Sequence, residues 1–215
     1  MGRSPLRYPG GKTKKSIQEK IIACFPSSFN TYVEPFFGGG GIFFAIPPSS
    51  VKNRFINDIN RGLVEFYKAM IDRPEEFISR CREIKSMQPG EEEVLTRSTS
   101  KEDSKKYNKR LKEKFDELKY NTDCDQALRY FFINRTVWAG RVTYDPKMES
   151  RMYFSNPAGW NIVDTNRLEE VAEWMKGSKI SCGDYRSLLH QEYDDALIYL
   201  DPPYVVDTEL SSKSK

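Results

Sequence analysis

Four short apolar runs stand out along the chain, and each is followed at once by a polar or glycine-rich corner. Short apolar runs bounded by turn residues are typical of strands buried in a parallel sheet. They predict strands at Thr31–Val33, Val51–Ile56, Lys179–Cys182 and Ala196–Leu200. Open α/β sheets bind their ligands at the carboxyl ends of the strands, where such corners lie. We therefore expect the four corners to form one site.

The pattern between the second and third runs is helical instead. Apolar residues recur there at intervals of three and four, as on one face of a helix. The positions that carry this spacing are Leu63, Phe66, Tyr67, Met70, Phe77, Cys81 and Ile84. Pro74 fits the first turn of the second of these helices. The chain thus reads as an α/β sheet, residues 1–61 and 161–215, interrupted by a mostly helical insertion at 62–160.

Composition changes this picture little. Hydrophobic residues make up 38% of the 215 positions and charged residues 30%, which suits one domain with an insertion and a solvated surface. The longest apolar runs, such as Ala196–Leu200, are far too short to cross a bilayer. Residues 1–5 lack the apolar stretch of a secretory signal. We expect no membrane partner.

The metal-ligating residues are few and scattered. His190 is the only histidine, and no two cysteines form a Cys-x-x-Cys pair. A structural zinc site, any other metal site and a disulfide scaffold are therefore not expected, and a reducing cytoplasm is the predicted location. The four cysteines are Cys24, Cys81, Cys124 and Cys182.

The net charge of +3 does not by itself indicate that the protein binds a polyanion such as DNA. Residues 101–119 hold eight lysines and arginines against five acids. A segment of this kind is either a solvated helix face or a surface that contacts phosphates. The sequence leaves both readings open.

The first corner is Glu34-Pro35-Phe36-Phe37-Gly38-Gly39-Gly40-Gly41. Glycines after a strand let the backbone come close to a ligand, although they also serve in tight turns. The dinucleotide fingerprint is incomplete, because Phe44 stands where it needs glycine. Asp58 ends the next predicted strand, where an acid can accept hydrogen bonds from ribose hydroxyls. Together the two corners favour a cofactor that contains a nucleoside.

The segment Arg7-Tyr8-Pro9-Gly10-Gly11-Lys12-Thr13 contains the Gly-Lys-Thr of a phosphate-binding loop. That motif also needs a glycine five positions before its Gly-Lys pair, and Leu6 stands there, so an NTPase is excluded. Lys12 can still neutralise a carboxylate.

The last corner, Asp201-Pro202-Pro203-Tyr204, carries the sharpest chemistry. The prolines end the strand and stiffen the backbone, so Asp201 and the Pro202 carbonyl become fixed acceptors. An exocyclic amine of adenine needs such acceptors, because its lone pair is delocalised into the ring. Tyr204 offers a face on which a base can stack. These residues predict transfer to an amine.

The motifs resemble, in their order, those of the Dam family of DNA adenine-N6 methyltransferases and its phage and restriction-associated relatives. The matching pieces span nearly the whole chain. They are Tyr8-Pro9-Gly10-Gly11-Lys12, Glu34–Gly40, Asn57-Asp58 with Asn60, Leu63 and Tyr67, Asn134-Arg135-Thr136, Gly183-Asp184-Tyr185 and Asp201-Pro202-Pro203-Tyr204.

The resemblance implies a Rossmann-like methyltransferase sheet that uses S-adenosylmethionine, with an inserted, mostly helical domain that recognises a site in double-stranded DNA. It implies that Asp201, Pro202 and Tyr204 are catalytic. The cofactor residues that it implies are Tyr8, Lys12, Phe37, Gly38, Gly40, Asp58, Asp184, Tyr185 and Asp201. Arg135, Trp138 and Arg141 are the implied DNA contacts, with Trp138 able to wedge into a base stack.

Two departures from the family pattern bear on function. The family often has Phe/Tyr-Asn-Gly-Leu and then an arginine, where this chain has Trp138-Ala139-Gly140-Arg141-Val142-Thr143. The DNA sequence that the protein recognises therefore cannot be inferred from the family.

The second departure is at the end of the chain. Only 11 residues follow Tyr204, whereas family members continue with further strands. We expect a truncated chain or one completed by a partner, because the last predicted strand would be an apolar edge. An inactive DNA- or cofactor-binding remnant and an RNA adenine methyltransferase are the alternatives.

Overall fold

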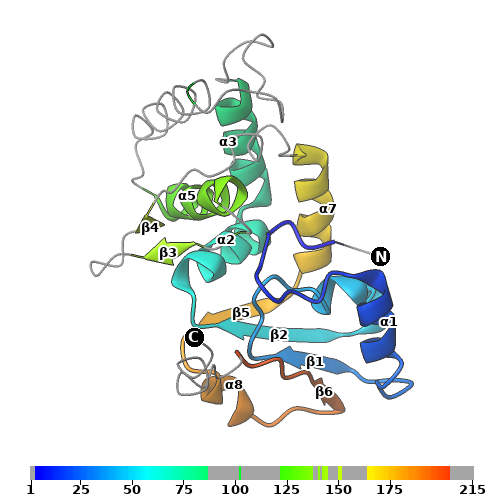
Figure 1. Ribbon diagram of the computed structural model, residues 1–215. Helices are drawn as coiled ribbons and strands as arrows, with labels where there is room; N and C mark the ends of the chain where they lie inside the picture. The colour runs from blue at the N-terminus through cyan, green and yellow to red at the C-terminus, as the bar shows by residue number, and fades with distance from the viewer. Residues whose placement is uncertain are drawn as a thin grey trace, which may run out of the picture.

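A parallel four-stranded sheet forms the lower part of the molecule in the view of Figure 1, below helices α2, α3 and α5. The computed structural model describes residues 3–86, 102, 122–137, 140, 142–144, 150–151 and 164–203. The sheet has the order β5-β2-β1-β6. Its strands are β1 (Thr31–Glu34), β2 (Asn53–Asp58), β5 (Lys179–Cys182) and β6 (Ala196–Ile198). Each overlaps a predicted run, with β1 and β2 ending one and two residues later than predicted, which confirms the α/β class.

Strand β1 is one of the two inner strands of the sheet, and all its residues are buried because strands flank it on both sides. Thr31 is in register with Asn53 of β2 and Ala196 of β6. On the other side of β2, Asp58 pairs with Cys182 of β5. The chain runs from β1 to β2 and β5, then crosses back to β6 beyond β1. The carboxyl ends of β1 and β6 therefore flank a point where the strand order reverses, which is where open sheets bind ligands.

Three of the described helices begin at a side chain that caps their first turn. Side-chain oxygens of Asn60, Thr122 and Asp164 accept hydrogen bonds from the first turns of α2, α5 and α7. Pro74 opens α3, as predicted. The α-helices of the described residues are α1 (Lys15–Ile22), α2 (Arg61–Asp72), α3 (Pro74–Ser86), α5 (Asp123–Thr136), α7 (Thr165–Met175) and α8 (Arg186–Leu189).

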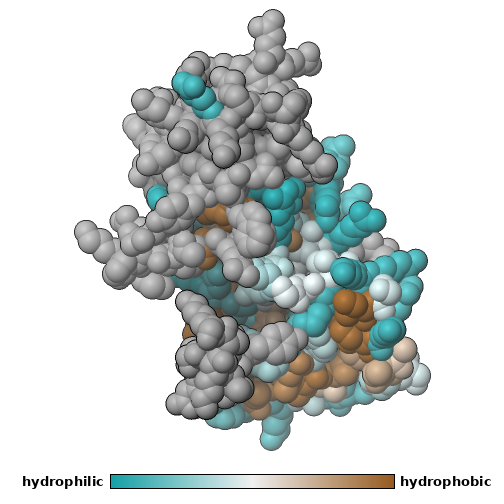
Figure 2. All heavy atoms as spheres, in the orientation of Figure 1, coloured by the Kyte–Doolittle hydropathy of each residue, from teal (hydrophilic) through white to brown (hydrophobic). Residues whose placement is uncertain are grey.

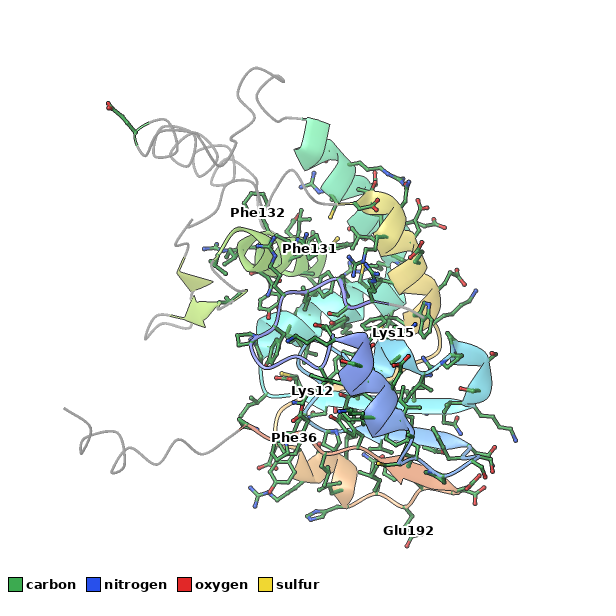
Figure 3. All side chains as sticks on the ribbon, turned by 45° about the vertical axis from the view of Figure 1, so that its right-hand side comes forward. Lys12, Lys15, Phe36, Phe131, Phe132 and Glu192 are labelled. Atoms are coloured by element: carbon green, nitrogen blue, oxygen red, sulfur yellow. The ribbon has the colours of Figure 1, made fainter. Side chains whose placement is uncertain are left out.

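Helix α2 joins the sheet to the other helices. It packs against α5 on one side and reaches β2, β5 and α7 on the other. The ring of Phe66 on α2 stacks on Phe131 of α5 at a centroid distance of 5.0 Å. Figure 3 shows Phe131 and Phe132 on α5, on the side of the molecule away from β6. One hydrophobic cluster includes residues of the sheet, α2, α3, α5 and α7. The division into a catalytic domain and a recognition insertion at 62–160 stays a prediction.

Several short elements complete the described structure. Two 3₁₀ turns, η1 (Phe43–Ala45) and η2 (Pro48–Ser50), connect β1 to β2. β3 (Thr143–Tyr144) pairs antiparallel with β4 (Ser150–Arg151).

The features that composition singled out are described only in part. The basic segment 101–119, except Glu102, lies outside the described residues. All four cysteines are free thiols. Within the described ranges, no helix has the length and apolar character needed to span a membrane.

Strand β6 is the apolar strand for which an open edge was expected. Among the described residues it pairs with β1 alone. Ile198 and Leu200 keep 42% and 50% of their surface exposed. Figure 2 shows hydrophobic residues gathered along the lower edge of the molecule, where Figure 1 places β6. The expected further strands or completing partner chain stay a prediction.

Candidate active site

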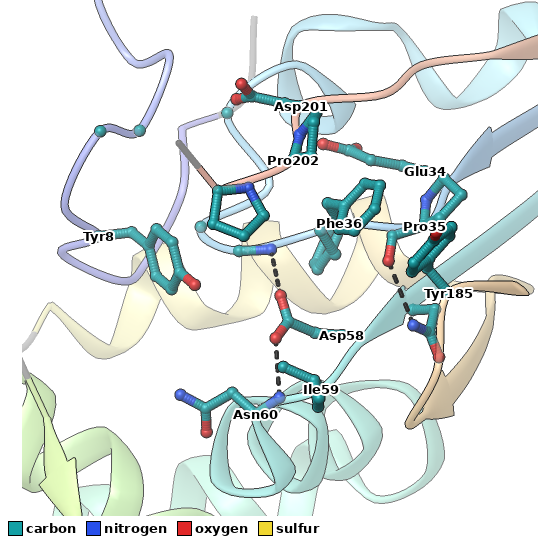
Figure 4. A pocket seen from close by; sticks show the side chains of 18 of the residues that line it. Tyr8, Glu34, Pro35, Phe36, Asp58, Ile59, Asn60, Tyr185, Asp201 and Pro202 are labelled. Carbon is teal, nitrogen blue, oxygen red and sulfur yellow. Dashed lines mark hydrogen bonds between the residues drawn. The ribbon is translucent and has the colours of Figure 1, made fainter. Parts of the chain in front are cut away.

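The carboxyl ends of the four strands open into one cavity of about 780 Å³. The segment between Tyr8 and Lys12 closes it from the side opposite the sheet (Figure 4). The residues predicted to bind cofactor or substrate that line this cavity are Tyr8, Lys12, Phe37, Gly38, Asp58, Asp184, Tyr185, Asp201 and Pro202. The structure thus brings together all four corners found in the sequence.

The glycine turn after β1 lies directly beneath the Tyr8–Lys12 segment. A Cβ on Gly38 would lie 2.8 Å from the ring of Tyr8, and one on Gly41 would lie 2.7 Å from the Lys12 carbonyl oxygen. Gly38 also has φ +50, which favours glycine. The missing side chains therefore let the N-terminal residues pack on the turn. The other predicted turn residues have packing roles: Gly40 lies against the Phe37 ring, which packs edge-on against Tyr67.

Asp58 holds the glycine turn in place from the end of β2. Its Oδ2 accepts a hydrogen bond from the Gly38 amide at 2.7 Å, and its Oδ1 accepts one from the Asn60 amide at 2.8 Å (Figure 4). Burial raises the pKa of this carboxyl, although both amides oppose the shift. The remaining acceptor capacity faces the cavity that Asp58 lines. Asp58 is therefore placed both to shape the turn and to accept a ligand hydroxyl.

Lys12 and Asp201 form an ion pair across the cavity. The Lys12 Nζ donates to Asp201 Oδ2 at 2.6 Å and to the Gly10 carbonyl at 3.3 Å. The side chains keep 21% and 28% of their surface exposed, so a ligand can reach both. A cation thus lies beside the predicted catalytic acid and orients its carboxylate.

Tyr8 lies across the cavity from Asp58 (Figure 4). Partial burial and the negative charge of Asp58 raise the pKa of Tyr8 to about 12. The hydroxyl therefore keeps its proton at neutral pH and remains a hydrogen-bond donor.

The corner after β5 holds a carboxylate that is paired locally. Asp184 accepts hydrogen bonds from Nε and the main-chain amide of Arg186, both at 2.9 Å, which lower its pKa to about 2. The neighbouring ring of Tyr185 lies 4.8 Å from that of Phe36. Asp184 is ionised at neutral pH, and the two rings form an aromatic wall of the cavity.

Among the lining residues that were not predicted as site residues, three bear on the chemistry of the cavity: Glu34, Phe36 and Ile59. Ile59 is 81% exposed beside Asp58. Ile59 is a single apolar residue between Asp58 and Asn60, so it belongs to no helical or strand pattern and nothing in the sequence was a reason to select it. Phe36 and Glu34 belong to the glycine-rich corner itself. Strand position would have identified Glu34, since the last residue of a central parallel strand points to the binding edge.

Glu34 is a buried carboxyl at the floor of the site, 3% exposed. It accepts a hydrogen bond from the Tyr32 hydroxyl at 2.9 Å. Burial raises its pKa well above the usual range, and the charges of Asp201 and Asp58 add to the shift, although the Tyr32 bond opposes it. Glu34 therefore favours its neutral form.

Glu34→Gln is expected to flatten the dependence of stability on pH. Because the native carboxyl binds its proton more tightly than the unfolded one, the wild-type free energy of unfolding falls as pH rises from the unfolded pKa of about 4.3 through the raised native value. Glutamine keeps the Tyr32 bond without a titrating proton. Urea unfolding at a series of pH values should show a smaller slope and higher stability at the alkaline end. Glu19→Gln, exposed on α1, should leave the slope unchanged, and a wild-type slope in Glu34→Gln would contradict the assignment.

The predicted DNA contacts are only partly described. Arg135 lies in the last turn of α5, where one Nη donates to the Pro5 carbonyl at 3.3 Å. Burial and the charges of Arg7 and Arg167 lower its pKa to about 10. Trp138, Arg141 and the catalytic candidate Tyr204 lie outside the described residues.

No group of three or more histidine, cysteine or acidic side chains is arranged to hold a metal ion in the part of the chain that the structure describes. The site is built from carboxylates, one lysine, aromatic rings and glycine backbone. These groups suit a ligand that carries hydroxyls, an aromatic ring and charges of both signs.

Comparison with known proteins shows which family has a sequence similar to this chain. The Type II methyltransferase M1.LlaDCHI of Lactococcus lactis is 27% identical over 210 residues, with 96% of this chain and 67% of the relative covered. The Type II methyltransferase M.MjaIII of Methanocaldococcus jannaschii is 30% identical over 211 residues, with 93% and 68% covered. The DNA adenine methylase of Haemophilus influenzae is 23% identical over 203 residues, with 93% and 63% covered. These relatives give no support to an RNA substrate or an inactive remnant.

A model of the D12 class of N6 adenine-specific DNA methyltransferases matches residues 8–214. The match begins at Tyr8 and includes every corner of the cavity. The chain therefore belongs to the D12 class of N6 adenine-specific DNA methyltransferases.

Proposed function

We propose that the cavity at the carboxyl edge of the sheet binds S-adenosylmethionine beside a target adenine of double-stranded DNA, and that Asp201 directs the methyl group to adenine N6. The observation that carries the proposal is the approach of Lys12 to Asp201 over a glycine turn held by Asp58. The volume of about 780 Å³ lies within the range of small-molecule sites.

The cofactor would be held by groups from three strand ends. Asp58 would accept hydrogen bonds from its ribose hydroxyls, and the glycine turn leaves room for its methionine part. Ile59 and the Phe36–Tyr185 wall offer apolar faces for its adenine. Asp184 provides an acceptor for the exocyclic amine of that base. Tyr8 and Lys12 would close over the charged end, with Lys12 near the carboxylate.

The catalytic residues act on the nucleophile. When bound, S-adenosylmethionine would supply a methyl group on a positively charged sulfur. Asp201 and the Pro202 carbonyl would accept hydrogen bonds from the target amine and localise its lone pair toward that methyl group. Tyr204 would stack on the flipped base. Lys12 would hold the Asp201 carboxylate in position until the amine arrives.

The helical part at 62–160 is the proposed recognition region, with Arg135, Trp138 and Arg141 as DNA contacts. Burial and the charges of Arg7 and Arg167 lower the pKa of Arg135, and a phosphate would relieve the repulsion within this group of three arginines. This supports an approach of the duplex along α5.

Methyl transfer tests the proposal directly. The purified chain, S-adenosylmethionine with a radiolabelled methyl group, and PCR-amplified duplex DNA of mixed sequence should yield N6-methyladenine, identified by mass spectrometry after digestion to nucleosides. RNA of the same sequence serves as the competing substrate and should remain unlabelled. Label in RNA alone would favour the RNA alternative. Cofactor binding by calorimetry without any transfer would favour the inactive remnant.

A further inference from the structure

Asn134 is a buried polar residue on α5 that makes an unusual set of contacts with the start of the chain. It is fully buried, at 0% exposed. Its Oδ1 accepts a hydrogen bond from the Arg7 amide at 3.0 Å, and its Nδ2 donates to the Arg7 carbonyl at 2.8 Å. The same Nδ2 donates to the Gly140 carbonyl at 3.3 Å. One side chain therefore satisfies both main-chain groups of Arg7, as a neighbouring strand would.

Arg7 lies directly before Tyr8 and five residues before Lys12, the two residues that close the cavity. Tyr8 packs on the glycine turn, with the closest atom of its ring 2.8 Å from the Cβ position of Gly38. Lys12 lies on the same turn and reaches Asp201. Within the N-terminal segment, residues 4–12, Asn134 thus holds Arg7, and the glycine turn contacts Tyr8 and Lys12.

Gly140 adds a steric contact at the same place. It has φ +72, and a Cβ there would lie 2.0 Å from the Arg7 carbonyl oxygen. The absence of a side chain at this position lets the two main-chain segments approach closely. Asn134 bonds to the main chain of Arg7 and to that of Gly140. Its side chain therefore holds together the two segments that the missing side chain of Gly140 allows to approach.

Two other side chains each bond to a single main-chain group of the N-terminal segment. Arg167 donates to the Ser4 carbonyl at 2.6 Å and Arg135 to the Pro5 carbonyl at 3.3 Å. Both are arginines whose guanidinium groups reach a single carbonyl of the segment. Asn134 is short, so its position is set by α5 with little freedom. It is the side chain best suited to set the position of residues 7 and 8.

We propose that Asn134 is a positioning residue for the cofactor site, acting from α5 through the main chain of Arg7 on Tyr8 and Lys12. The proposal rests on the proposed function, since it takes the cavity to be the cofactor site. It assigns to α5 a role in cofactor binding, in addition to any part in recognising DNA.

Asn134→Ala should loosen residues 4–12 while α5 stays folded. It removes three hydrogen bonds and leaves their main-chain partners unsatisfied, so we expect affinity for S-adenosylhomocysteine to fall about ten- to hundredfold. Amide hydrogen exchange should become faster in residues 4–12 and not in α5. Gly140→Ala should give the same two results by pushing the Arg7 carbonyl away.

Two control variants separate positioning from general loss of stability. Leu128→Ala removes a buried side chain of α5, and Gly177→Ala places a side chain at φ +74 where nothing lies within 4 Å. Neither should change cofactor affinity or the exchange of residues 4–12, measured below the unfolding temperature of each variant.

Unchanged affinity and unchanged exchange in Asn134→Ala would overturn the proposal, and so would an equal loss of affinity in Leu128→Ala. If Asn134→Ala does not fold, the proposal is tested on Gly140→Ala by the same two measurements, cofactor affinity and the hydrogen exchange of residues 4–12. A wild-type chain that does not bind S-adenosylhomocysteine would overturn the proposed function instead. The exchange data would then still test whether Asn134 holds the N-terminal segment.

Discussion

An Asp201→Ala variant is expected to transfer methyl groups at least about a thousandfold more slowly than the wild-type chain while remaining folded. Removing one preorganised electrostatic group from an active site typically reduces the rate by about 10²–10³. Here the lost carboxylate is also the ion partner of Lys12, which would be left to compete for the incoming ligand. Single-turnover transfer from radiolabelled S-adenosylmethionine to PCR-amplified DNA measures the loss.

The fold should survive because the ion pair is partly exposed. Side chains with 21% and 28% of their surface in solvent contribute about 0–1 kcal/mol as a pair. Thermal unfolding of Asp201→Ala should therefore resemble that of Asp194→Ala, an exposed acid at the opposite end of β6 that should keep full activity. Asp201→Asn keeps one acceptor oxygen without the charge and should fall between alanine and the wild type. Wild-type activity in Asp201→Ala would refute the catalytic assignment.

The strands were predictable from the sequence because buried parallel strands leave a simple pattern. Each is a short apolar run that ends in a polar corner. Their ends were less predictable, since pairing sets them. β6 ends at Ile198, the residue in register with Val33, and β2 begins at Asn53, the residue in register with Thr31. Apolar character continues past both points, to Val51 before β2 and to Leu200 after β6, so it does not mark where the strand pairing stops.

The cavity followed from the same pattern, because parallel strands bring their carboxyl ends to one edge of a sheet. The interactions within the cavity did not follow. Lys12 and Asp201 are 189 residues apart, and their contact depends on how residues 8–12 pack on the glycine turn. The sequence assigned Lys12 to a cofactor carboxylate and carried no information about this pairing. The burial of Glu34 and the bonds of Asn134 likewise depend on neighbours far away in sequence.

Asp58→Ala is expected to weaken cofactor binding about a hundredfold or more. Asp58 is the proposed acceptor for the ribose hydroxyls, and hydrogen bonds to a charged group contribute about 1.5–3 kcal/mol each. Its carboxylate also holds the Gly38 amide at 2.7 Å, so its removal frees the turn on which Tyr8 packs. Calorimetric titration with S-adenosylhomocysteine gives the dissociation constant. In the wild type, affinity should fall with decreasing pH at a higher pH than for an ordinary aspartate, because burial raises the pKa of Asp58.

Asp164→Ala is the matched control for this variant. Asp164 also accepts two main-chain amides, those of Asn166 and Arg167, at the start of α7 and away from the cavity. Its loss should cost about 0.5–2 kcal/mol of stability, as for other helix caps, with no change in cofactor affinity. Equal losses of affinity in the two variants would mean that Asp58 acts through stability alone. A loss confined to Asp58→Ala would place the ribose at the end of β2, since the two variants differ in their position relative to the cavity and not in the kind of main-chain bond they remove.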